Sequence, residues 1–227
     1  MRGIICFNED QSAVIKLMGI KAIYIAGPDG TGKTTYLNCI NKAITDKVKK
    51  HVWIRSPKIL SKPLMLYCRI VGLTKYKTID NIKYGTHDFH KSDFVSWLFP
   101  ILQLVDFKIK WFLEKRRIKP HDIVLFDRFS LDTLADLMVD TRKMDLHRSW
   151  IGKQFIQTIH KDMIVIILEV KEKTIRARKK DTLHDENLML KLKVYKILSK
   201  ELGISVIDNN RDFDTVKTEI LNYVLNE

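Results

Sequence analysis

Residues 27 to 34 of the chain read Gly27-Pro28-Asp29-Gly30-Thr31-Gly32-Lys33-Thr34. This stretch satisfies the pattern G-x-x-x-x-G-K-[ST], in which the backbone amides of a glycine-rich loop surround phosphate oxygens. The apolar run 22–26 before it has the length and composition of a strand, and 35–44 after it carries apolar residues three to four positions apart, as a helix does. A strand, a glycine-rich loop and a helix start thus follow one another, and we predict a phosphate-binding loop.

The residue types of this loop explain its chemistry. Glycines at positions 27, 30 and 32 allow positive φ angles, so that successive N–H groups can point at one anion near the positive end of the helix dipole. Lys33 is expected to reach the β- and γ-phosphates of a nucleoside triphosphate, and the Thr34 hydroxyl to bind Mg²⁺. Thr35 either touches a phosphate or only occupies the first helical turn. The predicted nucleotide-binding residues are Gly27, Pro28, Asp29, Gly30, Thr31, Gly32, Lys33, Thr34 and Thr35.

Length and composition fit one globular domain. The chain has 227 residues, of which 45% are hydrophobic and 30% charged, as is typical of a single α/β domain. No apolar stretch approaches about 18 residues and the N-terminus lacks the apolar block of a signal peptide, so we expect no membrane segment and a cytoplasmic location. The cysteines, Cys6, Cys39 and Cys68, are not spaced as metal ligands and are expected to be reduced structural thiols.

The net charge of +13 invites a nucleic-acid hypothesis. The lysines are spread over most segments, however, and no basic tail or aromatic-interleaved platform accompanies them. A protein whose ligands are polyanionic carries positive charge for that reason alone. We therefore expect a nucleotide or another small molecule, and not nucleic acid, as the main ligand.

Strand-like and helix-like segments alternate along the chain. Besides 22–26, four segments read as strands: 51–55, 123–127, 163–168 and 204–208. Helices are expected at 35–44, 59–73, 92–118, 131–140, 148–160, 173–180, 187–202 and 213–225, the third of them bent at Pro100. Because the strands are apolar without alternation, they predict a parallel sheet with helices on both faces and ligands at the carboxyl ends of the strands. No linker divides the chain, so we expect one domain at 19–227 after an N-terminal extension at 1–18.

Three candidates lie at the predicted strand ends. Asp127 ends the third strand, where its carboxylate can hold Mg²⁺ or orient a second substrate. Arg128 beside it, and Arg55 at the end of the second strand, offer planar guanidinium groups for bidentate contact with phosphate. We expect Lys33, Asp127 and Arg128 to take part in catalysis.

The densest basic run, 176–180, lies on a predicted helix after the fourth strand. A solvated charged face is one interpretation. The other is a mobile lid over about 172–186, whose Arg176 and Arg178 close over the transferring phosphoryl group and exclude water. The phosphate loop has no basic residue between Gly27 and Gly32, so a catalytic arginine has to come from elsewhere, and the lid is its natural source.

The phosphate loop, the turn 55–57, the triplet 127–129 (Asp-Arg-Phe) and the basic lid together resemble the thymidylate kinase family of P-loop kinases, over residues 19–225. The resemblance implies a three-layer P-loop fold with a five-stranded parallel sheet in the order 2-3-1-4-5. It also implies ATP with Mg²⁺ as the phosphate donor and a nucleoside monophosphate as the acceptor, with dTMP converted to dTDP as the first candidate reaction.

The same resemblance assigns residues on the acceptor side. It implies that the acceptor is contacted by Asp29, Arg55, Arg128 and Phe129. Thr34 and Asp127 are the implied Mg²⁺ ligands, and the polar segment 74–91 reads as a long loop or small insertion on the acceptor side. Family members are often homodimers packed through long apolar helices, a role that Trp97 and Trp111 would serve here.

Three positions depart from the family pattern. Where the family has an arginine that grips the acceptor phosphate, this chain has Phe107, with Lys108 and Lys110 nearby. Where thymidylate kinases place an aromatic residue and a glutamine that reads thymine, it has Asp136 and Leu137. Leucine cannot form the paired amide hydrogen bonds of glutamine, so the acceptor stays open.

Two other functions fit the sequence. The first is a kinase of an unphosphorylated nucleoside or of a non-nucleotide small metabolite, which positions 107 and 137 favour over a strict dTMP kinase. The second is a non-catalytic nucleotide-binding switch or regulatory protein. Guanine-reading switches carry N-K-x-D after a late strand, and residues 209–212 (Asn-Asn-Arg-Asp) imitate it only in part.

Overall fold

The computed structural model describes residues 21–44, 49–79, 82–119, 122–179 and 182–225. The expected N-terminal extension, with Cys6, lies outside these ranges, as do residues 180 and 181 of the expected lid. Within the ranges just given, no helix combines the length and the apolar character needed to cross a bilayer. Cys39 and Cys68 are free thiols.

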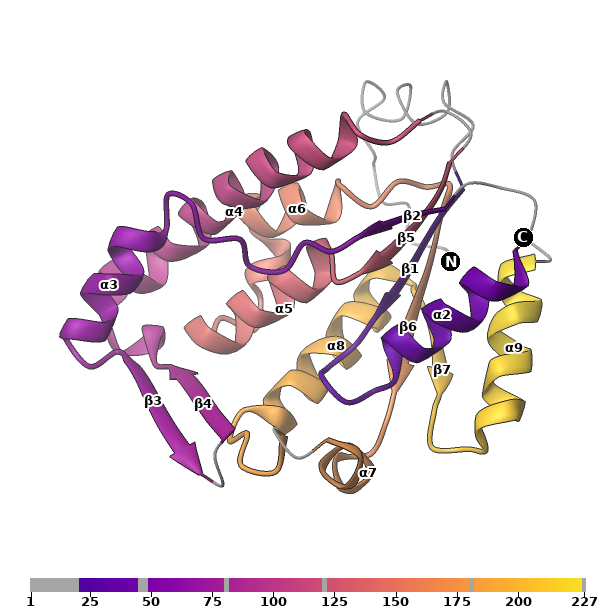
Figure 1. Cartoon of the computed structure of the whole chain (residues 1–227). Helices are drawn as coiled ribbons and strands as arrows, with labels where there is room; N and C mark the ends of the chain where they lie inside the picture. Colours follow the sequence, from indigo (N-terminus) through magenta and orange to yellow (C-terminus); the bar gives the residue numbers. More distant parts are fainter. Residues whose placement is uncertain (1–20, 45–48, 80–81, 120–121, 180–181, 226–227) are drawn as a thin grey trace.

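Five strands form one parallel sheet (Figure 1). They are β1 (Lys21–Ala26), β2 (Lys49–Val52), β5 (Ile123–Asp127), β6 (Met163–Glu169) and β7 (Ser205–Asp208). Their order is β2-β5-β1-β6-β7, and every neighbouring pair is parallel. The labels β3 and β4 belong to a separate hairpin, so the order counted within this sheet alone reads 2-3-1-4-5. The α/β class and the five parallel strands are as predicted.

Helices cover both faces of the sheet, because β1 sends alternate side chains to two cores. Ile23 and Ile25 face α2 (Lys33–Ala43) and α9 (Phe213–Leu225). Tyr24 belongs to the larger core on the other face, where α4 (Asp93–Lys115), α5 (Ser130–Thr141), α6 (Trp150–Ile156) and α8 (Leu188–Leu202) pack. Trp111 packs in that core against Phe126 at 5.7 Å between ring centres, whereas Trp97 is exposed.

The segment 74–91, expected as a long loop or small insertion, forms a β-hairpin and a short turn. β3 (Thr74–Ile79) and β4 (Ile82–His87) pair antiparallel, and a short 3₁₀ turn, η1 (Phe89–Lys91), follows. The hairpin stands apart from the central sheet, so its strands are not buried on both faces (Figure 1). Their sequence is therefore polar and lacks the apolar run by which the other strands were predicted. Gly85 leaves room for the cross-strand Tyr76 ring, which a Cβ atom there would approach to 3.2 Å.

Two predicted helices begin later than expected. The chain before α3 (Lys62–Ile70) is held by Asp106 of α4, whose carboxylate accepts from the N–H groups of residues 59, 60 and 61 at 2.6–3.0 Å. In the second case a 3₁₀ turn, η2 (Leu146–Arg148), comes first, and α6 starts only at Trp150, after its N-cap Ser149, whose hydroxyl accepts from Gly152 N–H at 3.2 Å. A side-chain cap therefore marks the start of α6, whereas α3 starts after a segment whose amides are held by Asp106.

Candidate functional site

The phosphate loop connects β1 to α2 with the backbone that its glycines predict. Gly27, Gly30 and Gly32 have φ angles of 146°, 84° and 90°. A Cβ atom at Gly27 would lie 3.0 Å from Thr31 Oγ1 and 3.2 Å from the Leu168 carbonyl oxygen. Gly32 is the N-cap of α2, so the positive end of the helix dipole faces the loop. The loop is shaped to receive an anion.

Lys33 is buried and folds back over this loop. Its Nζ donates to the carbonyl oxygens of Gly27 at 2.7 Å and Pro28 at 2.6 Å. Burial lowers the pKa of its ammonium group to about 8. The group is therefore cationic at neutral pH, and its present partners are neutral acceptors that an incoming phosphate can replace.

Thr34 and Asp127 come together at the start of α2. The Thr34 hydroxyl donates to Asp127 Oδ2 at 2.7 Å, which joins the loop to the carboxyl end of β5. Hydroxyl and carboxylate oxygens are the donor set that Mg²⁺ takes in nucleotide sites, with phosphates and water completing its shell. The two residues predicted as metal ligands thus lie side by side. Elsewhere in the described ranges, no group of three His, Cys, Asp or Glu residues is arranged for a metal.

Asn209, just after β7, holds the phosphate loop through hydrogen bonds of its side chain. Its side-chain nitrogen donates to the Thr31 carbonyl oxygen at 2.8 Å, and its oxygen accepts from Tyr36 Oη at 2.6 Å. It is 2% exposed, so it is not placed to read a base. This structural role was missed, because a single asparagine after a late strand gives no sequence signal of its own.

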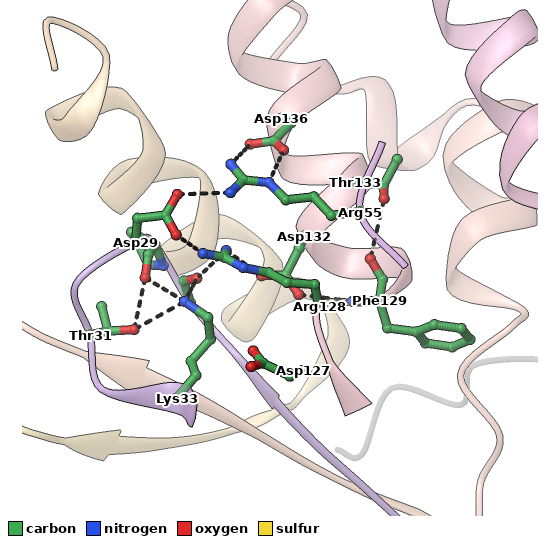
Figure 2. Close-up of polar contacts among 12 residues, drawn as sticks. Asp29, Thr31, Lys33, Arg55, Asp127, Arg128, Phe129, Asp132, Thr133 and Asp136 are labelled. Carbon is green, nitrogen blue, oxygen red and sulfur yellow. Dashed lines mark hydrogen bonds and ion pairs between the residues drawn. The ribbon is translucent and has the colours of Figure 1, made fainter. Parts of the chain in front are cut away.

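Arg128 turns from β5 toward the loop in a conformation that is rare for a residue other than glycine. Its φ is 80°, and its carbonyl oxygen accepts from Ile54 N–H at 2.9 Å. The buried guanidinium group contacts Asp29 of the loop and lies 3.3 Å from both Asp132 Oδ1 and the Gly27 carbonyl oxygen. Figure 2 shows the guanidinium group between these partners. Strained backbone of this kind is typical of functional sites.

Asp132 anchors Arg128 and was not predicted. It is 1% exposed and accepts from the hydroxyl groups of Tyr24 and Tyr195, each at 2.6 Å, and from Phe129 N–H at 3.1 Å. Burial, and next the charge of Asp132, raise the pKa of both tyrosines well above its usual value, so both remain donors. The sequence held no direct signal for this role, because Arg128 lies before α5 and not on it.

Arg55 joins the loop to α5. Its Nη1 lies 2.8 Å from Asp29 Oδ2, and its Nε lies 2.8 Å from Asp136 Oδ2 (Figure 2). Burial alone would raise the pKa of Asp136, but the Arg55 guanidinium outweighs it and holds that pKa below its usual value. Asp29 therefore lies between two guanidinium groups, those of Arg55 and Arg128.

A cavity of about 510 Å³ opens beside the phosphate loop. Asp29 and Arg55 form the wall next to the loop, α5 contributes Asp136, Leu137 and Asp140, and the hairpin contributes residues 85–87. Phe99 of α4 adds an apolar wall. The predicted insertion thus borders the same space as two of the predicted acceptor residues, Asp29 and Arg55, whereas Arg128 and Phe129 do not line it. We call this space the acceptor cavity.

The arginines of the expected lid are engaged in holding their own segment. α7 (Glu172–Arg178) packs on the loop, where a Cβ atom at Gly30 would lie 3.0 Å from Ile175 Cγ2. Arg176 contacts Glu172 at 2.8 Å and donates to the carbonyl oxygens of Thr182, Leu183 and Asp185. Arg178 donates to the Asn209 carbonyl oxygen at 3.2 Å. Lys179 reaches Asp29 of the loop at 3.9 Å.

Phe129 does not fit its expected role at the acceptor. Its ring is fully buried among the aromatic residues of the larger core, including Phe107 at 5.3 Å and Phe126 at 4.3 Å between ring centres. An apolar ring at the end of β5 packs inward because that face of the sheet is covered by α4. The two stand-ins for the family arginine also point elsewhere: Lys108 bonds to Gln154 and Lys110 to Glu114.

Comparisons with known proteins found solved structures that are similar to this one. No family model matches the chain, and no curated protein matches its sequence. A deoxyadenosine kinase from M. mycoides, solved with bound dATP, matches with a TM-score of 0.52 at 20% identity, over 91% of this chain and 100% of that one. A gluconokinase from Sinorhizobium meliloti 1021 gives a TM-score of 0.46 at 12% identity, over 91% and 92% of the two chains. The first of these similarities shows that the chain shares the fold of that deoxyadenosine kinase.

Proposed function

We propose that this chain is an ATP-dependent phosphotransferase that acts on a hydroxyl group of a small molecule, with an unphosphorylated nucleoside as the leading acceptor class. The observation that carries the proposal is the position of Asp29. It belongs to the phosphate loop and also lines the acceptor cavity, so a donor and an acceptor would meet at its carboxylate. The fold match to a deoxyadenosine kinase supports the same acceptor class.

The residues suggest how the transfer proceeds. The acceptor oxygen attacks the γ-phosphorus of ATP, the bond from that phosphorus to the bridging oxygen breaks, and ADP leaves. The carboxylate of Asp29 accepts the hydroxyl proton, and Arg55 and Arg128 hold that carboxylate in place. Thr34 and Asp127 would hold Mg²⁺, which neutralises phosphate charge when bound. Lys33 stabilises the charge on the transferred group.

The charge around Asp29 favours an acceptor without a phosphate group. Arg55 and Arg128 face three carboxylates, those of Asp29, Asp132 and Asp136. A phosphate on the acceptor would have to displace these partners and leave buried carboxylates unpaired, which costs several kcal/mol. A neutral hydroxyl acceptor needs no such exchange.

One observation favours a second candidate, a nucleoside monophosphate kinase with dTMP as substrate. Lys58 lines the acceptor cavity, is exposed, and has no ion pair among the residues that the structure describes. An ammonium group in that position is suited to an acceptor phosphate. The lid arginines would join this reaction, or the first one, only by leaving the carbonyl oxygens that they now contact.

A coupled assay of ADP release tests both candidates. The purified chain is mixed with Mg-ATP and with matched pairs of acceptors, each nucleoside beside its own 5′-monophosphate. The proposal expects turnover with at least one nucleoside and weaker turnover with its monophosphate. Turnover only with monophosphates would replace the first candidate by the second, and no acceptor-dependent ADP release with any hydroxyl compound or nucleotide would refute phosphotransfer.

A further inference from the structure

Three aspartates follow one face of α5, and only two of them have a cationic partner. Asp132, Asp136 and Asp140 stand four residues apart, so each lies about 6 Å beyond the last along the helix axis. Arg128 contacts the first and Arg55 the second. Asp140 lines the acceptor cavity and makes no hydrogen bond or ion pair with the rest of the described chain.

The surroundings of Asp140 disfavour a charged carboxylate. Burial raises its pKa well above the usual value, and Asp136 raises it further. Asp140 also occupies the last turn of α5, at the negative end of the helix dipole. The cations that face it from α8 and from the segment after β2 are Lys191, Arg55 and Lys58, and the first two are engaged by Asp185 at 2.7 Å and Asp136 at 2.8 Å.

Two histidines also line the cavity, His184 and His87 of β4. The ring of His87 is held by a neighbouring hydroxyl group. Its Nδ1 lies 3.1 Å from Thr74 Oγ1, and burial lowers its pKa to about 4, so the ring is neutral. A neutral carboxylic acid offers one O–H donor beside one carbonyl acceptor. Asp140 therefore presents a hydrogen-bond donor and an acceptor side by side, and an uncharged ligand can pair with both.

The neighbouring walls are apolar. Leu137 is 2% exposed and Phe99 is 4% exposed, and both line the cavity beside the aspartates of α5. A group that fits here has apolar faces and one polar edge. Nucleobases have this form, whereas a polyol carries polar groups on all sides. Leu137 occupies the position where a base-reading glutamine was expected, and it cannot form hydrogen bonds with its side chain.

We infer that Asp140 is the residue that selects the acceptor, and that its neutral carboxyl group pairs with the donor–acceptor edge of a nucleobase. This inference rests on the proposed function and names the group that reads the base. The carboxyl O–H donates to the ring nitrogen or carbonyl oxygen of the edge, and the carboxyl C=O accepts from the adjacent N–H. Asparagine at this position presents the same two groups, whereas alanine presents neither.

The test compares each accepted nucleoside with its analogue methylated on that edge. For the wild-type chain, kcat/KM is expected to fall about tenfold to a hundredfold on methylation, as for loss of one bidentate pair. Asp140→Ala should remove most of this preference, and Asp140→Asn should keep it. Asp145→Asn, the same change at an exposed position outside the cavity, is the matched control and should behave as wild type.

The pH profile separates recognition from a merely structural effect. As pH rises and Asp140 ionises, it loses its donor, so the wild-type preference should decline while that of Asp140→Asn stays constant. The inference would be overturned if Asp140→Ala kept the full preference for the unmethylated nucleoside, or if 2-deoxyribose were phosphorylated as efficiently as any nucleoside. Either result would leave phosphotransfer intact. Absence of turnover with every hydroxyl compound and nucleotide would instead refute the proposed function.

Discussion

The phosphate loop and the acceptor cavity share Asp29, yet they are built in opposite ways. The loop is one continuous octapeptide between β1 and α2, and its shape comes from backbone angles. The cavity is assembled from the hairpin, α4, α5 and the segments after β2 and α7, and its character comes from side-chain charges. Local sequence therefore determines the donor side, whereas long-range packing determines the acceptor side. The predictions below test this contrast.

The largest effect is expected on the acceptor side, from Asp132→Ala. The change removes one carboxylate partner of the buried Arg128 guanidinium and the shared acceptor of the hydroxyl groups of Tyr24 and Tyr195. Removing one partner of a buried ion pair costs about 3–5 kcal/mol in the free energy of unfolding. Urea unfolding at neutral pH measures it, with Asp145→Ala as an exposed control expected to stay within about 0.5 kcal/mol. A loss below about 1 kcal/mol would show that the network is not structural.

On the donor side, Lys33→Ala is expected to lower kcat by about a hundredfold to a thousandfold, as for loss of one charge-stabilising donor. The change removes hydrogen bonds to two loop carbonyl groups but also removes a buried charge, so the unfolding transition should change less than in Asp132→Ala. Lys42→Ala, at an exposed position in the last turn of the same helix, is the control. Activity equal to that of the control would contradict the role assigned to Lys33.

The contrast also explains what the sequence could predict. The octapeptide and the apolar strands are local patterns, and they gave the loop, the parallel sheet, and the neighbouring positions of Thr34 and Asp127. Asp132 and Asp140 were missed because their roles depend on partners brought by other elements, such as Tyr195 from α8. Phe129 was misassigned for the same reason, since nothing within the triplet tells whether a ring faces the core or the cavity.

Gly30→Ala tests how far the backbone alone determines the donor side. At a φ of 84°, alanine costs about 1–2 kcal/mol, and its Cβ would meet Ile175 Cγ2 at 3.0 Å, so α7 has to shift. Gly203→Ala is the matched control, because Gly203 has a φ of 62° and no atom within 4 Å of the added Cβ. We expect a similar backbone cost in both variants but weaker ATP binding only in Gly30→Ala, measured by calorimetry. Equal ATP affinity in the two variants would show that the contact between the loop and α7 does not matter for nucleotide binding.

The smallest effect is the proton linked to ATP binding. The Lys33 ammonium group has a pKa of about 8 because it is buried among neutral carbonyl groups. Phosphate oxygens raise that pKa, so binding above pH 8 takes up a proton, and ATP affinity should fall about tenfold between pH 7 and pH 9. Calorimetry in two buffers of different ionisation enthalpy measures the uptake directly. Lys33→Arg, which stays charged over this range, should bind ATP with no such pH dependence; the same dependence in that variant would assign the proton to another group.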